Sequence, residues 1–346
     1  MAPPVQRRQI SKDRFGIVFG SHKSQSYIDP LVRGAASHFH RTISWNATGT
    51  LIATGSTDRT IRVWNPEITT PKSQIELRGH THAVEKLLFN PTRDFELASC
   101  ASDGTVRFWD TRSKACTTKL DVGGEVFTLS WSVDGTVLVA GTKNDVLFPI
   151  STTSTPAILG RHPQTTQTNQ TCFSNAYPPG DLLLTHSDGS VSIRSYPSFS
   201  TIHTLMAHTS SCTSIAYSPN GKYLAVGGSD ALISLWDTAD WVCRRTLSNP
   251  TFGGVKGLSW SWDGRFIVGA SEDVSSGDGA GMGSGGLEIY HAESGDVVYT
   301  VPTGTSGIPA VEWHPSRYWL AHTQIEASTG KSMLKVVGAA GVGLSI

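Results

Sequence analysis

Short stretches in which every second residue is hydrophobic recur along the chain, separated by turn-forming residues. In one unit, Ile215 and Tyr217 alternate with polar or small neighbours, and the turn sequence 219–221 (Pro-Asn-Gly) follows. Further apolar stretches cover residues 223–226 and 232–236. This two-residue period predicts antiparallel strands joined by tight turns. No stretch of useful length has the helical period, so the pattern predicts an all-β fold.

The unit recurs seven times with a nearly constant period. Each copy carries an aromatic anchor: Trp45, Phe89, Trp131, Phe173, Tyr217, Trp260 and Trp313. Successive anchors are 44, 42, 42, 44, 43 and 53 residues apart. A four-stranded antiparallel unit cannot bury both of its faces alone, so such units stack radially. Seven units predict one seven-bladed β-propeller.

The second unit contains the sequence motifs of a known repeat. Gly79-His80 stands nine residues before Phe89, and Trp109-Asp110 follows later in the same unit. These motifs resemble those of the WD-repeat (WD40) family. The resemblance implies a WD40 propeller and a structural tetrad made of His80, Ser99, Asp103 and Trp109. In such a tetrad a turn aspartate accepts hydrogen bonds from backbone N–H groups and from the histidine, and the serine and indole extend the network.

The tetrad is incomplete in the other units. The partial sets are His208, Asp230 and Trp236 in the fifth unit, Thr54, Asp58 and Trp64 in the first, and the turn aspartates Asp188 and Asp273 in the fourth and sixth. Val226 stands at the serine position of the fifth unit. The same residue types form the catalytic triad of many hydrolases, here His80, Asp103 and Ser99. However, parts of the set reappear in other units at the spacing of the repeat, which is not expected of a single active site. We therefore expect no catalytic residues.

The other histidines show no spacing typical of metal ligands, and no H-x-x-x-H pair or carboxylate partner stands beside them. The sequence therefore predicts neither a metal site nor a cofactor.

The last unit lacks a fourth predicted strand, so the ring must be closed from elsewhere. Leu31-Val32-Arg33 lies just ahead of the first unit, and we expect a closing strand near residues 29–35 that pairs with Met333–Val337. This assigns residues 29–346 to a single propeller. Residues 1–28 become a flexible basic arm outside the ring. The candidate partner-docking residues of that arm are Arg7, Arg8, Lys12 and Arg14.

Composition narrows the functional classes. The chain of 346 residues has 28 Lys+Arg and 28 Asp+Glu, so its net charge gives no general attraction to nucleic acid. Any RNA contact is expected to be indirect or confined to the arm. Five dispersed cysteines favour free thiols in a reducing compartment. No apolar run is long enough to span a bilayer, so a soluble intracellular protein without membrane contact is predicted.

A glycine-rich run at residues 275–286 contains the letters G-x-G-x-x-G, which in other contexts cradle a pyrophosphate. That fingerprint must follow a strand and open a helix. Here the run separates two predicted strands and accounts for the long 53-residue spacing. We therefore interpret it as a loop insertion in the sixth blade, and we expect no small-molecule substrate.

The sequences of several blades resemble those of one family more specifically, the WD-repeat subunits of THO complexes. The resemblance runs through residues 79–120, 129–147, 192–237, 256–273 and 310–322. It implies a non-catalytic scaffold in the nucleus that docks the long helical THO subunits and couples transcription to mRNA processing and export.

Two other functions stay open on the sequence. Trp109-Asp110-Thr111-Arg112 matches the W-D-x-R ending of substrate receptors of cullin–RING ubiquitin ligases. A nuclear propeller that binds a peptide in its central cavity is a further alternative.

Overall fold

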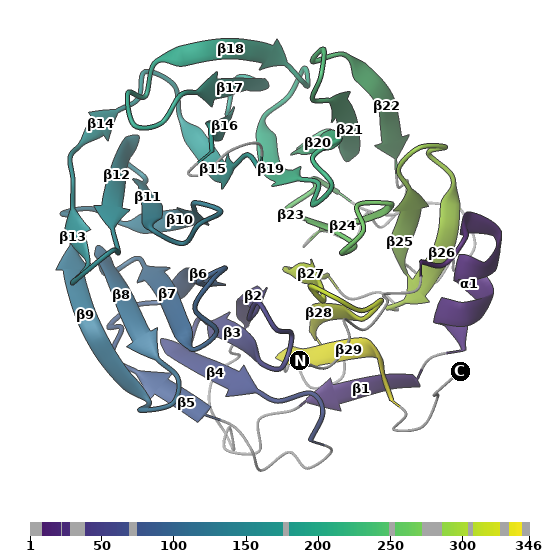
Figure 1. Cartoon of the computed structure of the whole chain (residues 1–346), viewed down its shortest axis with the longest axis horizontal. Coiled ribbons are helices and arrows are strands. Elements are labelled where there is room, and N and C mark those ends of the chain that lie inside the picture. The colour runs from purple at the N-terminus through teal and green to yellow at the C-terminus, as the bar shows by residue number, and fades with distance from the viewer. Residues whose placement is uncertain are drawn as a thin grey trace, which may run out of the picture.

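The computed structural model describes residues 9–21, 23–27, 39–68, 75–175, 180–248, 253–271, 286–303, 307–325 and 332–340. These residues form seven antiparallel sheets arranged in a ring (Figure 1). Each sheet is one blade, and the strand that begins the blade lies innermost. The predicted seven-bladed, all-β propeller is confirmed.

The first four blades follow each other along the chain. Blade 1 consists of β2 (His40–Trp45), β3 (Ile52–Ser56), β4 (Thr60–Trp64) and β5 (Ile75–Arg78). Blade 2 consists of β6 (Val84–Phe89), β7 (Glu96–Ala101), β8 (Thr105–Asp110) and β9 (Ala115–Asp121). Blade 3 consists of β10 (Val126–Trp131), β11 (Val137–Thr142), β12 (Val146–Ser151) and two short outer pieces, β13 (Ala157–Ile158) and β14 (His162–Pro163). Blade 4 consists of β15 (Thr168–Phe173), β16 (Leu182–His186), β17 (Ser190–Arg194) and β18 (Thr201–Met206).

The remaining three blades complete the ring. Blade 5 consists of β19 (Cys212–Tyr217), β20 (Tyr223–Gly228), β21 (Leu232–Asp237) and β22 (Cys243–Ser248). Blade 6 consists of β23 (Gly257–Trp260), β24 (Phe266–Ala270), β25 (Gly286–His291) and β26 (Val297–Pro302). Blade 7 consists of β27 (Val311–Trp313), β28 (Leu320–Ile325), β29 (Ser332–Ala340) and, as its outer strand, β1 (Lys23–Tyr27).

Two of the tryptophan anchors, Trp131 and Trp260, connect their blade to the one before it. The indole N–H of Trp131 donates to the carbonyl of Leu88 at 3.3 Å, and that of Trp260 donates to the carbonyl of Ala216 at 3.0 Å. Both indoles are almost fully buried between adjacent inner strands. Because Trp131 and Trp260 each bury a large ring and also satisfy the polar atom of that ring, these two anchors stabilise the stacking of blades 2 and 3 and of blades 5 and 6.

The ring is closed by β1, and this corrects the expected position of the closing strand. Gln25 faces Val336 and Tyr27 faces Leu334 in the antiparallel pair of β1 with β29. The expected partner strand is therefore right, but the closing strand lies at residues 23–27, whereas residues 29–35 lie outside the described part of the chain. The sequence of β1, KSQSY, has one large apolar residue, so its alternation is too weak to mark a strand.

The N-terminal segment also differs from the expected flexible arm. Residues 12–20 form α1 (Lys12–Gly20), whose Phe15 and Phe19 are fully buried against blades 6 and 7. The ring of Phe15 lies 4.0 Å from that of Phe266. Figure 1 shows α1 outside β26. The expectation of an arm detached from the ring is therefore wrong for residues 12–27.

Candidate functional site

Blade 2 contains the complete predicted tetrad. The indole N–H of Trp109 donates to Ser99 Oγ at 2.8 Å, and Ser99 Oγ lies 2.8 Å from His80 Nε2. His80 Nδ1 lies 3.0 Å from Asp103 Oδ2. The ionised Asp103 accepts a hydrogen bond from Nδ1–H, so Nε2 of the neutral ring accepts from the Ser99 hydroxyl, whose oxygen accepts from the indole N–H. The tetrad is thus a continuous hydrogen-bonded path from the blade interior to the turn.

The electrostatics of the blade 2 tetrad fit a structural network. Burial alone would raise the pKa of Asp103, but hydrogen bonds from Thr105 and from the N–H of Thr81, together with His80, hold that pKa at about 2. Burial lowers the pKa of His80, and the neighbouring carboxylate opposes that shift. Ser99 has no exposed surface. A substrate cannot reach this hydroxyl, which separates the arrangement from a hydrolase triad.

Blade 5 rebuilds the tetrad with a serine that the sequence pattern missed. His208 Nδ1 lies 3.0 Å from Asp230 Oδ2, as in blade 2. Val226 occupies the expected serine position, but Ser234 faces it across the sheet on β21. Ser234 Oγ lies 3.1 Å from His208 Nε2 and accepts the indole N–H of Trp236 at 2.9 Å. The available signal was a hydroxyl two residues before the tryptophan.

Blade 1 replaces the missing histidine with an arginine. Arg62 is almost fully buried and its Nη2 donates to Asp58 Oδ2 at 2.7 Å. Burial opposes ionisation of Asp58, but Arg62 and Thr60 outweigh it and hold the pKa of this carboxyl well below its usual range. The indole of Trp64 donates to Thr54 Oγ1 at 3.2 Å. Arg62 occupies the position equivalent to Ser234, two residues before the tryptophan.

The remaining blades show partial versions. Asp188 Oδ1 accepts hydrogen bonds from the N–H and hydroxyl of Ser190 at 2.9 and 2.6 Å. Asp273 lies outside the described residues. In blade 7 the serine position is held by His322, which is buried and whose ring nitrogens have no hydrogen-bond partner among the described residues. Burial lowers the pKa of His322 to about 3, so this histidine is neutral at neutral pH. Each described set of tetrad positions therefore connects parts of its own blade, and the sets do not converge on a shared site.

The N-terminal candidates divide between the described and undescribed parts of the chain. Lys12 forms an ion pair with Asp296 at the outer end of blade 6. Arg14 lies on the exposed side of α1. Arg7 and Arg8 lie outside the described residues. Lys12 therefore anchors the helix to the ring, and Arg14 is the described arm residue that stays available on the surface.

Two chambers lie along the propeller axis, one at each end. An upper chamber of 400 Å³ opens where the inner strands begin, and a lower chamber of 620 Å³ opens where they end. Both are lined by residues from all seven blades. The side chains shared by the two linings mark the constriction between them: Ile43, Lys86, Gln170, Leu258 and Val311.

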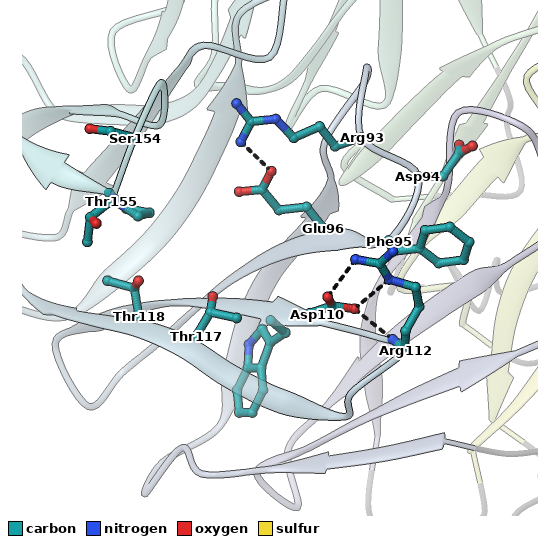
Figure 2. A pocket seen from close by; sticks show the side chains of 12 residues that line it. Arg93, Asp94, Phe95, Glu96, Asp110, Arg112, Thr117, Thr118, Ser154 and Thr155 are labelled. Carbon is teal, nitrogen blue, oxygen red and sulfur yellow. Dashed lines mark hydrogen bonds and ion pairs between the residues drawn. The ribbon is translucent and has the colours of Figure 1, made fainter.

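A groove of 670 Å³ lies at the outer rim between blades 2 and 3 (Figure 2). It contains the arginine of the W-D-x-R motif. Arg112 donates from Nη2 to Asp110 Oδ2 at 2.9 Å and from Nε to Asp110 Oδ1 at 3.2 Å, and its guanidinium lies 4.9 Å from the ring centre of Phe95. Arg93 is similarly held, by Glu96 at 2.9 Å and by the carbonyl of Thr152 at 3.0 Å. Both arginines of the groove are therefore engaged within the chain.

Three other expectations concern metal, nucleotide and membrane binding. The described residues contain no group of three or more histidine, cysteine or acidic side chains placed to hold a metal ion. Of the glycine-rich run, residues 275–285 lie outside the described part of the chain. Gly286 begins strand β25, so the run leads into a strand and not into a helix, as predicted. None of the described helices is long and apolar enough to cross a membrane.

Comparisons with known proteins agree with this architecture. The family model described as WD domain, G-beta repeat, matches residues 36–65, 71–110, 199–237 and 241–273. The β-propeller domain of Cps50 (Swd1) from Myceliophteria thermophila superposes with a TM-score of 0.72. That alignment covers 91% of this chain and 99% of the other at 16% identity, which supports the fold alone.

Two curated proteins align over most of the chain. The WD repeat-containing protein AAC3 of Dictyostelium discoideum is 30% identical over 324 residues, covering 86% of this chain and 64% of that protein. THO complex subunit 3 of Arabidopsis thaliana is 34% identical over 283 residues, covering 81% of this chain and 84% of that protein. A match of this extent on both chains, together with the repeats and the seven blades, shows that this protein is a WD-repeat propeller that belongs to the family of THO complex subunit 3.

Proposed function

We propose that this protein is the non-catalytic WD-repeat scaffold of a nuclear THO complex, where it couples transcription to mRNA processing and export. The observation that carries the proposal is the 34% identity to THO complex subunit 3 along 84% of that protein. Propeller fold alone would support many functions, so this extended match is what makes the assignment specific.

The described geometry is compatible with a scaffold. Seven rigid sheets present preorganised loops on two faces, so little ordering entropy opposes the docking of a partner. The His–Ser–Asp sets of blades 2 and 5 lie inside their blades, where Ser99 has no exposed surface and Ser234 is almost fully buried. We infer that the partners are the long helical THO subunits, and that RNA is contacted indirectly or through the N-terminal segment.

The ubiquitin-ligase alternative depends on Arg112. A partner that used this guanidinium would have to displace the bidentate bond to Asp110 and the stacking on Phe95. These contacts within the chain account for the position of Arg112 without any partner protein. They therefore do not support the ubiquitin-ligase alternative.

Affinity purification of the full-length tagged chain from nuclear extract, followed by mass spectrometry, tests the proposal. We expect recovery of the other THO subunits, and we expect ribonuclease treatment to leave their yield unchanged because protein contacts hold the complex. Recovery of a cullin and its adaptor without THO subunits would overturn the proposal.

A further inference from the structure

The upper chamber contains two lysines that the fold leaves without an anionic partner. Lys86 lies on β6 and Lys256 immediately precedes β23, and both line the chamber. Neither ammonium group forms an ion pair or a hydrogen bond with any described residue. Every other lysine or arginine of this lining is accounted for, since Arg41 pairs with Glu85.

Lys86 lies at the constriction, because it lines the upper and the lower chamber alike. Burial lowers the pKa of its ammonium group, and the nearby Glu312 opposes that shift. A positive charge in such surroundings is costly unless water or an opposite charge solvates it. The constriction is therefore a place where an incoming negative group would be stabilised.

Neither Glu85 nor Glu312 forms an ion pair with Lys86 in the described part of the chain. Glu85 is already engaged, with Oε2 2.5 Å from Arg41 Nη1 and Oε1 accepting the hydroxyl of Ser102 at 2.8 Å. Glu312 Oε2 accepts the backbone N–H of Trp45 at 3.0 Å, and within the described chain it forms no ion pair with Lys86. Burial raises the pKa of Glu312, and the nearby Lys86 opposes that shift. The lining of the upper chamber contains three basic side chains, Arg41, Lys86 and Lys256, against the single carboxylate of Glu85, so its formal charge is positive.

The remaining lining suits an inserted peptide. Phe127 and three polar side chains, Thr128, Asn169 and Thr213, also line the chamber. Asn169 and Thr213 donate to backbone carbonyls of the chain itself. A recessed cavity concentrates the field of its charged groups and so attracts ligands of opposite sign. The volume of 400 Å³ accommodates one or two side chains with their backbone, and not a folded domain.

We propose that the upper chamber binds an acidic segment of a partner protein, with Lys86 contacting an inserted aspartate or glutamate carboxylate and Lys256 contacting a second one at the rim. This deepens the proposed scaffold function by naming a docking site and the chemistry of its occupant, and only the identity of the partner rests on that function.

Fluorescence anisotropy of the full-length protein with labelled octapeptides tests the site. The probe alternates glutamate and glycine, and two control peptides replace glutamate by glutamine or by lysine. We expect saturable binding of the glutamate peptide alone, weakened as the salt concentration rises. Lys86→Met keeps the apolar stem and removes the charge, and we expect it to weaken binding at least tenfold, as for loss of one charge-assisted bond. Lys256→Gln should also weaken binding.

Lys222→Met is the matched control, because Lys222 pairs with exposed Glu293 away from the upper chamber and its loss changes the net charge equally. Unchanged thermal unfolding of each variant confirms that the ring is intact. Equal binding of the glutamate and glutamine peptides, or unchanged affinity in Lys86→Met, would overturn the proposal. A phosphoserine peptide that bound tenfold more tightly than the glutamate peptide would overturn the carboxylate assignment. Recovery of THO subunits is measured separately, so either proposal can fail alone.

Discussion

Single residues show how one network is built from different side chains. In blade 1 the buried Arg62 holds Asp58 where blade 2 uses His80 for Asp103. In blade 5 a serine from the neighbouring strand replaces the one lost at Val226. In each case the turn aspartate needs a hydrogen-bond donor and the indole needs an acceptor. Side chains of different types meet these needs when they carry such a group at the right position.

Replacing Arg62 tests this interpretation at the residue scale. Arg62→Met keeps the apolar stem but leaves the carboxylate of Asp58 without its main partner. We expect a loss of about 2 kcal/mol in the free energy of unfolding, below the full value for a buried pair because Asp58 is partly exposed. Urea denaturation gives the value. Arg244→Met removes an exposed arginine paired with Asp237 and Asp240 and should cost less than about 1 kcal/mol. Equal losses in the two variants would contradict the structural role of Arg62.

At the element scale, strands with large apolar residues were predictable and weakly patterned elements were not. β20 and β21 were evident because apolar residues alternate or cluster between clear turns. α1 has nine residues, of which Phe15 and Phe19 are buried, and it includes the poor helix formers Gly16 and Gly20. Gly16 is needed for close packing, since a Cβ there would lie 2.6 Å from the carbonyl oxygen of Val298. The requirement comes from the surface of blade 6, which no local pattern in α1 reveals.

The docking of α1 depends on its two phenylalanines. Phe19→Ala should reduce the free energy of unfolding by about 3 kcal/mol, because the ring is fully buried against Tyr299 and Trp313. Ile17→Ala is the control on the same helix, where the side chain is 77% exposed, and it should change stability by less than about 0.5 kcal/mol. Chemical denaturation of the three proteins distinguishes them. If Phe19→Ala were as stable as Ile17→Ala, the helix would not contribute to the ring.

At the scale of the whole molecule, the sequence predicted the number of blades and the need for an N-terminal closing strand. Both follow from the repeat, because a blade with three strands leaves an unpaired edge. It misplaced the strand because closure is a contact between residues more than 300 positions apart, as in the pairing of Gln25 with Val336. Such a pairing depends on how the whole ring brings the N-terminal and C-terminal segments together. The alternation of apolar and polar residues within one segment contains no information about that.

Removal of the N-terminal segment tests closure directly. A chain lacking residues 1–28 loses both α1 and β1, so β29 keeps one unpaired edge and the aromatic surface of blades 6 and 7 is uncovered. We expect a lower and broader thermal transition and concentration-dependent association, because an exposed strand edge pairs readily with another chain. A chain lacking only residues 1–8 retains both elements and removes Arg7 and Arg8, so it should unfold and sediment like the full-length protein. Identical unfolding of the two truncated chains would show that the other strands hold the ring closed and that β1 is dispensable.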